Sequence, residues 1–277
     1  MRIKFIVFIV GILLSNSLHA QLVEEMEDES RLYAENKQVN QFFRRFNGEE
    51  DEKGERYYPK DRQYRSEKLR KKYIGMLFDA SNPGISPELK VEFAKEVLNK
   101  DKPVILNFHG ANWFSEVHTL FTMNGKDVPV TLFMELEKHH LGTRWVISRV
   151  YSEVFKSVFE KDTVKVGKFL HPLSHELDFM NLRKAFSNAD SVNQYTLKKF
   201  IPDHLSVFLY EIRKGNMKFK TVEEVKFHFF QINGWYFELA EFNRSGYNTG
   251  WLISNLVKVK NESEKNLLRK YVYYETK

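Results

Sequence analysis

Cysteine is absent from the 277-residue chain, so neither a disulfide framework nor a thiol nucleophile is available to it. Glycine and proline are sparse, at 13 and 7 residues, which excludes a collagen-like or low-complexity chain. Hydrophobic residues make up 42% of the chain and charged residues 29%, which is the composition of a folded protein and not of a disordered one. At about 150 residues per domain, this length predicts two domains.

No apolar run reaches the roughly 20 residues that a membrane-spanning helix needs. The longest run, 5–14, is preceded by Arg2 and Lys4 and followed by a short polar stretch that ends at Ala20. This three-part layout is typical of a secretory signal peptide, with a retained membrane anchor as the alternative. We therefore expect a signal peptide over 1–20, a flexible lead-in over 21–34, and export to the periplasm or the cell exterior without a retained transmembrane helix.

The chain also lacks a large excess of positive or negative charge. Cleavage of the predicted signal peptide would remove Arg2 and Lys4 from the 43 basic residues. The remaining 41 basic residues exceed the 37 acidic residues by four. The densest basic run, 62–72, follows Asp61 and contains Glu67, whereas a nucleic-acid binder concentrates Lys and Arg on one face. We expect no nucleic-acid partner, and we interpret the run as a solvated surface, with a phosphate-binding patch as the alternative.

Several catalytic and metal-binding motifs are absent as well. The chain has no GxSxG elbow, no glycine-rich phosphate loop and no EF-hand loop, which disfavours the corresponding hydrolase, nucleotide and calcium chemistry. His171 and His175 stand four residues apart, a spacing that suits two zinc ligands on a helix. The zinc motif HExxH is missing, however, and Pro172 marks His171 as a helix-entry residue. We expect no metal site and no cofactor.

Two halves of the chain resemble each other. The string WVIS at 145–148 recurs as WLIS at 251–254, and LFTMNG at 120–125 recurs as FFQING at 229–234. Weaker matches upstream keep the same order. Matches that recur in order indicate a duplicated unit.

Each half is predicted to begin with helices and to end in an antiparallel meander of strands. Asn233-Gly234 is a strong signal for a two-residue type I′ hairpin turn, and Asn124-Gly125 marks the same place in the first half with a longer loop. The predicted helices span 40–46, 66–78, 86–98, 173–186, 192–200 and 203–214, and the predicted strands span 114–123, 128–138, 143–151, 222–232, 235–242 and 251–259.

This element order predicts the α+β class, with two tandem units whose N-terminal helices pack on a curved antiparallel sheet. The order, together with the aromatic hairpin NGWYFELAEFNRSGYNTGWLISNL at 233–256, resembles the nuclear transport factor two-like, or cystatin-like, cone superfamily in tandem. As an exported chain it also resembles envelope proteins of Bacteroidetes. The expected domains are a first cone-like unit over 35–152, a linker over 153–170, a second unit over 171–260 and a C-terminal helix over 261–277.

The resemblance implies a conical pocket and no single activity, because the superfamily includes isomerases, dehydratases, transport factors and secretion-system subunits. One candidate pair for acid/base chemistry is Glu116 and His118, which would share a face of a strand. A core or rim pair is the other interpretation, so no catalytic residue is assigned. An enzyme with isomerase-like or hydrolase-like proton transfer in the first-unit pocket remains the alternative function.

Aromatic residues supply the candidate binding surface. Phe229 and Phe230 point to opposite faces of the second-half hairpin, so both faces are apolar, and the face away from the unit's helices needs a partner. That partner is the first unit, a second chain or a ligand. We predict a non-catalytic ligand-binding or protein-assembly module that takes a small molecule or an envelope protein, with self-association through this hairpin as a further option. The predicted binding residues are Trp113, Trp235, Tyr236, Tyr247 and Trp251.

Overall fold

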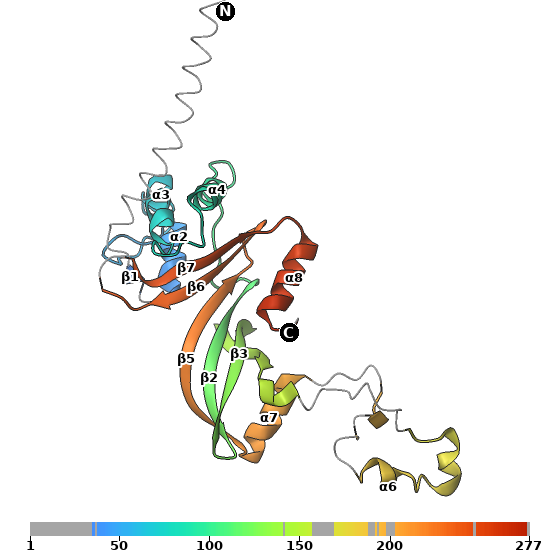
Figure 1. The fold of residues 1–277 in the computed structure, drawn as a ribbon. Helices are drawn as coiled ribbons and strands as arrows, with labels where there is room; N and C mark the ends of the chain where they lie inside the picture. The colour runs from blue at the N-terminus through green and yellow to red at the C-terminus, as the bar shows by residue number, and fades with distance from the viewer. Residues whose placement is uncertain are drawn as a thin grey trace, which may run out of the picture. The chain divides into compact units, whose positions relative to one another are not determined.

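The computed structural model describes residues 35–36, 38–140, 142–156, 169–187, 192, 194–197, 203–245 and 248–275. The predicted signal peptide, the lead-in, most of the linker and Tyr247 lie outside the described residues. The described part of the chain is α+β, as predicted (Figure 1).

Helices and strands follow one another in the predicted order, and all six predicted strands are confirmed, with ends displaced by a few residues at most. Helices α2 and α7 end at glycines in the left-handed conformation, and Ser66, Ser86 and Asp203 cap the starts of α3, α4 and α7. The helices are α2 (Val39–Asn47), α3 (Glu67–Met76), α4 (Pro87–Val97), α6 (Leu182–Ala185), α7 (His204–Lys214) and α8 (Glu262–Val272), with 3-10 turns η1 (Glu153–Phe155) and η2 (Pro172–Leu177). The strands are β1 (Glu35–Asn36), β2 (Trp113–Met123), β3 (Lys126–His139), β4 (Gly142–Tyr151), β5 (Met217–Phe229), β6 (Trp235–Phe242) and β7 (Thr249–Lys258).

The strands form one sheet in the order β1-β7-β6-β5-β2-β3-β4, and the six longer strands are antiparallel. The order is symmetric about the seam between β2 and β5, because the first, second and third strands of each half run outward from it. A duplicated three-strand unit joined at its first strand gives this order. The duplication itself stays a prediction.

The compact units of the structure differ from the predicted domains. Of the described residues, unit 1 contains those up to residue 117 together with those in 133–147 and 224–277, and unit 2 contains those in 118–132 and 148–223. Each unit therefore draws on both predicted ranges, 35–152 and 171–260. Strands β2, β3, β4 and β5 each have residues in both units.

The core of unit 1 pairs helices from the first half of the chain with strands from the second. Phe42 of α2 lies 6.0 Å from Phe237 of β6, between ring centroids, and Phe93 of α4 lies 5.2 Å from Trp235. Figure 1 shows α2 and α3 beside β6 and β7. We had expected the helices of each half to cover that half's own strands, and the structure corrects this expectation: α2 and α4 complete the core of the second-half hairpin.

The segment around α8 covers the opposite face of the unit 1 strands. Tyr273, directly after α8, stacks on Phe114 with centroids 4.5 Å apart, and the Arg269 guanidinium lies 4.8 Å above the Phe230 ring. Phe229 and Phe230 are 0% and 1% exposed. The hairpin thus has both faces buried within its own chain, so the predicted self-association surface is not exposed.

Unit 2 is organised around α7. Phe208 of α7 packs edge-on against Phe121 of β2 at 5.3 Å. The Ser152 backbone N–H donates to His204 Nδ1 at the start of α7, and the Ser152 hydroxyl donates to the Pro129 carbonyl. These contacts hold α7 against the strand ends of this unit.

Two local predictions were wrong. The helix expected over 173–186 is divided into η2 and the four-residue α6, because Asp178 and Phe179 between them take left-handed backbone angles of +51° and +54°. The two-residue type I′ turn lies at Asn124-Gly125, where both residues have positive φ, and not at Asn233-Gly234, where Gly234 has positive φ and Asn233 does not. Of the helix expected over 192–200, residues 193 and 198–200 lie outside the described residues.

Candidate functional site

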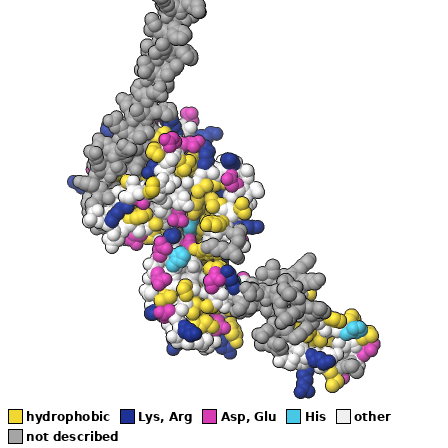
Figure 2. All heavy atoms as spheres, in the orientation of Figure 1, with side chains coloured by type: hydrophobic (Ala, Val, Ile, Leu, Met, Phe, Trp, Pro, Cys, Tyr) yellow, Lys and Arg dark blue, Asp and Glu magenta, His cyan; other side chains and the backbone are white. Residues whose placement is uncertain are grey.

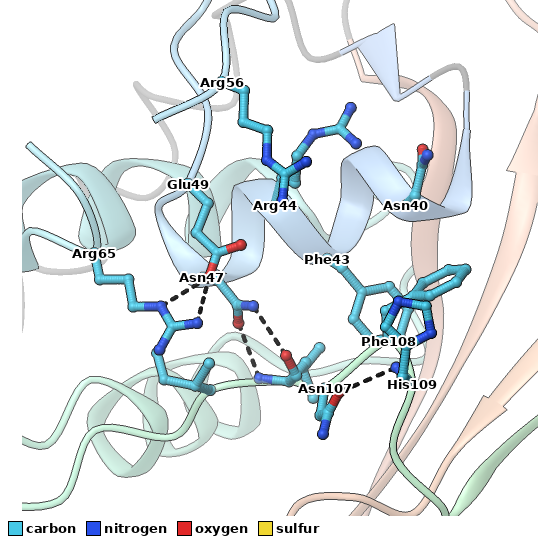
Figure 3. A pocket seen from close by; sticks show the side chains of 12 residues that line it. Asn40, Phe43, Arg44, Asn47, Glu49, Arg56, Arg65, Asn107, Phe108 and His109 are labelled. Atoms are coloured by element: carbon cyan, nitrogen blue, oxygen red, sulfur yellow. Dashed lines mark hydrogen bonds and ion pairs between the residues drawn. The ribbon is translucent and has the colours of Figure 1, made fainter. Parts of the chain in front are cut away.

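A pocket of about 640 Å³ lies in unit 1 between α2, the loop that follows it and the segment that leads into β2 (Figure 3). Four of its residues, Asn40, Phe43, Arg44 and Asn47, come from one face of α2 at spacings of three and four residues. The loop supplies Glu49, Arg56 and Arg65, and the segment before β2 supplies residues 105–109.

Asn47 connects two walls of this arginine pocket. Its side-chain amide donates to the Leu106 carbonyl and accepts from the Leu106 N–H, with both distances 2.9 Å. Asn47 is 4% exposed, so this paired hydrogen bond is sheltered from water. The segment before β2 is thereby held at a set distance from the C-terminal turn of α2.

Arg70 of α3 does not line the pocket but stabilises the backbone segments next to it. It is 3% exposed and donates hydrogen bonds to the carbonyls of Phe46, Val97 and Val104. Burial, with a smaller contribution from the nearby Arg65 charge, lowers the pKa of Arg70 to about 10, so the guanidinium stays protonated at neutral pH. The α2 C-terminus, with its partly negative carbonyls, is a favourable place for that charge.

Arginine side chains outnumber carboxylates at the pocket. Arg44 and Arg45 share Glu50, with Nε to carboxylate distances of 2.6 and 3.3 Å. Arg65 forms an ion pair with Glu49 at 2.6 Å.

Arg56 is the third arginine that lines the pocket, with Arg44 and Arg65. Its Cζ lies 5.4 Å from the centre of the Tyr58 ring, and it forms no ion pair with a carboxylate among the described residues. Three guanidinium groups, those of Arg44, Arg56 and Arg65, therefore line the pocket with one carboxylate, that of Glu49, so the lining side chains carry a surplus of two positive charges.

An aromatic wall borders the charged part. The Phe108 ring lies 5.2 Å from both Phe43 and His109, between centroids, and Figure 3 shows the three side chains grouped together. His109 is fixed by a 2.9 Å hydrogen bond between Nδ1 and the Thr143 hydroxyl. Asn40 Oδ1 is enclosed beside this wall without a hydrogen-bond donor among the described residues. The pocket thus combines cationic groups with flat apolar surface.

Most of the predicted binding residues lie in the core. Trp113, Trp235, Tyr236 and Trp251 are 3%, 1%, 2% and 8% exposed. None of the four lines the arginine pocket, although Trp113 lines a smaller pocket nearby. Their aromatic character marks the strands that carry the core, because large rings pack well between sheet and helices. Their role in binding stays a prediction.

Glu116 and His118, the predicted acid/base pair, each have a further polar contact. The Glu116 carboxylate lies 2.7 Å from His228 Nε2 and accepts a hydrogen bond from the Tyr274 hydroxyl. His118 Nδ1 lies 3.4 Å from the Thr131 hydroxyl. Neither residue lines either of the two pockets described in this part of the chain.

His171 acts at the start of η2, as predicted from Pro172. Its Nδ1 accepts a hydrogen bond from the Leu173 N–H, and His175 Nδ1 lies 2.9 Å from the Pro172 carbonyl. Within the described residues no group of three or more His, Asp or Glu side chains is arranged to hold a metal ion.

The arginine pocket was missed by the sequence argument. The spacing of Asn40, Phe43, Arg44 and Asn47 was available as a signal, since it places polar and charged groups on one helical face next to an aromatic residue. The phosphate-patch alternative for 62–72 contained Arg65. What the sequence lacked was the position of 105–109, which completes the pocket.

Comparison with protein-family models, with curated proteins and with solved structures returned no match. No helix in the described part of the chain has the length and apolar character that a membrane crossing requires. Acidic and basic side chains are interspersed on the face shown in Figure 2.

Proposed function

We propose that this protein is a non-catalytic binding module whose ligand is a small organic anion held in the arginine pocket. The observation that carries the proposal is the surplus of two positive charges among the side chains that line the pocket, of which Arg56 has no carboxylate partner among the described residues. A ligand with two negative charges would neutralise that surplus.

The pocket also favours a flat ligand body. Its volume of about 640 Å³ falls within the roughly 300 to 1,000 Å³ of small-molecule sites. Phe108 and His109 offer ring surface next to the guanidinium groups, which bind carboxylate or phosphate oxygens through paired N–H donors. An aromatic dicarboxylate or an aryl phosphate has the required combination.

The proposal also includes the export of the chain and its tandem organisation. We infer that the signal peptide over 1–20 directs export and that the mature chain acts in the periplasm or at the cell exterior as an envelope-associated protein. The tandem cone-like resemblance supports a ligand-binding role and does not identify the ligand. The acid/base alternative has less support, because neither Glu116 nor His118 lines either of the two pockets described in unit 1.

The test uses titration calorimetry on the mature chain from Gln21 onward, with phthalate, phenyl phosphate, inorganic phosphate and benzyl alcohol as probes. We expect phthalate and phenyl phosphate to bind more tightly than inorganic phosphate, and benzyl alcohol to bind weakest. Arg56→Gln should lower the affinity for the two aromatic anions about tenfold, because it removes a charged hydrogen-bond donor.

The matched control is Arg62→Gln, an exposed arginine of the same loop that does not line the pocket. It removes the same charge and should leave the affinities nearly unchanged. If the two variants lose the same affinity for the aromatic anions, the effect is one of net charge and not of the pocket. If no anionic probe binds, the proposal is wrong.

A further inference from the structure

A second, smaller pocket of about 220 Å³ lies elsewhere in unit 1 and shares no lining residue with the arginine pocket. Its walls come from residues 110–114 at the start of β2, from Glu135 and Leu136 of β3, and from Arg269 and Tyr273 at the C-terminal end of α8. Its volume is about a third of that of the arginine pocket, so it suits a smaller ligand.

Two opposite charges line this pocket without pairing. The Arg269 Nη2 donates to Asn112 Oδ1 at 2.6 Å, and its enclosed Nε has no acceptor among the described residues. The Glu135 carboxylate accepts a 3.2 Å hydrogen bond from the Tyr273 hydroxyl. Among the described residues neither group lies within ion-pair distance of an opposite charge, and this includes each other.

Apart from Asn112 and backbone groups, the remaining lining is apolar. Phe114 and Tyr273 stack with centroids 4.5 Å apart, and Trp113 and Leu136 lie beside them. Apolar surface beside a charged group displaces part of its water, which strengthens electrostatic contacts made there and raises the cost of leaving the charge without a partner.

We propose that this pocket binds a small free α-amino acid with an apolar side chain. Its carboxylate would meet the Arg269 guanidinium, its ammonium group would meet Glu135, and its side chain would contact the aromatic and leucine walls. A simple anion would leave Glu135 unpaired, and a simple cation would leave Arg269 unpaired. A zwitterion satisfies both charges and adds no net charge to the pocket.

The test titrates the mature chain with L-valine and with two analogues that each lack one of its charges. Isobutylamine lacks the carboxylate, and isovalerate lacks the amino group. We expect saturable binding of valine, measured by calorimetry or by chemical-shift changes. Both analogues should bind with affinities at least about tenfold weaker, because each leaves one charge of the pocket unpaired.

Two variants assign the contacts. Arg269→Gln should abolish the preference for valine over isobutylamine, and Glu135→Gln should abolish the preference for valine over isovalerate. Glu135→Gln keeps an acceptor for the Tyr273 hydroxyl, and Lys270→Gln, an exposed neighbour on α8 that does not line the pocket, is the matched control. Far-ultraviolet circular dichroism checks that each variant is folded.

Several outcomes would overturn the proposal. If valine shows no saturable binding to the wild-type protein, or if the analogues bind as tightly as valine, the zwitterion site is contradicted. Both results come from the wild-type protein, so they hold even if both variants fail to fold. Loss of valine binding in Arg56→Gln, with no loss in Arg269→Gln, would place the ligand in the arginine pocket. The two proposals are thus distinguished, because phthalate binding tests one and valine selectivity tests the other.

Discussion

His228 and Glu116 are 112 residues apart in the sequence and form a buried hydrogen bond of 2.7 Å between Nε2 and Oε2. The other imidazole nitrogen lies 2.9 Å from the Tyr236 hydroxyl, and the Tyr274 hydroxyl donates to the other Glu116 oxygen. Burial, followed by the charges of Glu238 and Glu116, raises the pKa of Tyr236, so its hydroxyl stays protonated. This network connects β2, β5, β6 and the segment after α8.

Replacing one member of the network should destabilise the fold. His228→Phe keeps a ring against Phe114 but leaves the Glu116 carboxylate and the Tyr236 hydroxyl without their shared partner. We expect the free energy of unfolding in urea to fall by about 3 kcal/mol.

A second substitution separates this effect from simple loss of packing. Glu116→Leu in the His228→Phe background removes the buried carboxylate that has lost its imidazole partner and should restore about 1 to 2 kcal/mol. Additive losses in the double variant would show that the two side chains are not coupled.

Gly48 and Gly215 provide a matched pair for backbone strain and steric fit. Both end helices with φ of +70° and +75°. A Cβ at Gly48 would lie 2.7 Å from Arg70 Cγ, whereas a Cβ at Gly215 meets nothing within 4 Å.

Alanine at Gly215 should therefore cost about 1 kcal/mol of stability from the left-handed conformation alone. Alanine at Gly48 should cost about 2 to 3 kcal/mol, because Arg70 must also shift from its three carbonyls. Urea denaturation of both variants checks the difference, and equal losses would contradict the close approach of α2 and Arg70.

His204 should make the stability of the protein depend on pH. Burial lowers the pKa of His204 below its ordinary value of 6.5, and its Nδ1 accepts the Ser152 N–H, a bond that protonation of Nδ1 removes. The unfolded chain therefore binds this proton at a higher pH than the folded chain, so the stabilising contribution is complete above about pH 6.5 and is lost as the pH falls through the folded pKa.

The measurement compares the wild type with His204→Gln, whose amide oxygen can accept the same N–H. Between pH 7.5 and 5 the wild type should lose more unfolding free energy than the variant. Parallel curves for the two proteins would show that His204 has no such linkage.

The exchange of helices between the two halves predicts how fragments behave. Residues 35–152 expressed alone would expose Phe42 and Phe46 of α2, which are 0% exposed in the whole chain and pack on Phe237 of β6. We expect this fragment and residues 171–277 to be unfolded separately and to regain circular dichroism and dispersed NMR spectra on mixing. Two fragments that each fold alone would instead restore the originally predicted domains.

Much of the secondary structure was available from local sequence. Alternating and continuous apolar runs marked the six longer strands, and Ser66, Ser86 with Pro87, and Gly215 marked helix ends, because caps and turn residues act through their immediate neighbours. The hairpin turns show where local information ends. Asn233-Gly234 carries the stronger turn signal, yet the Phe230 N–H bonds to the Asn112 carbonyl and Gln231 bonds to the backbone of Asn107 and Ala111, which draws 230–232 away from a two-residue hairpin.

The sequence by itself determined the α+β class, the order of helices and strands and the aromatic content of the core. Only the tertiary structure decided which helices cover which strands, and that Trp113, Trp235, Tyr236 and Trp251 are buried in the core. It also brought Arg44, Arg56 and Arg65 to the wall formed by residues 105–109, and Arg269 to the pocket that Glu135 lines. The physical reason is that hydrophobic burial is not directional and specifies a buried face but no partner, whereas the partners are selected by contacts between residues far apart in the chain, such as Asn47 with Leu106 and Glu116 with His228.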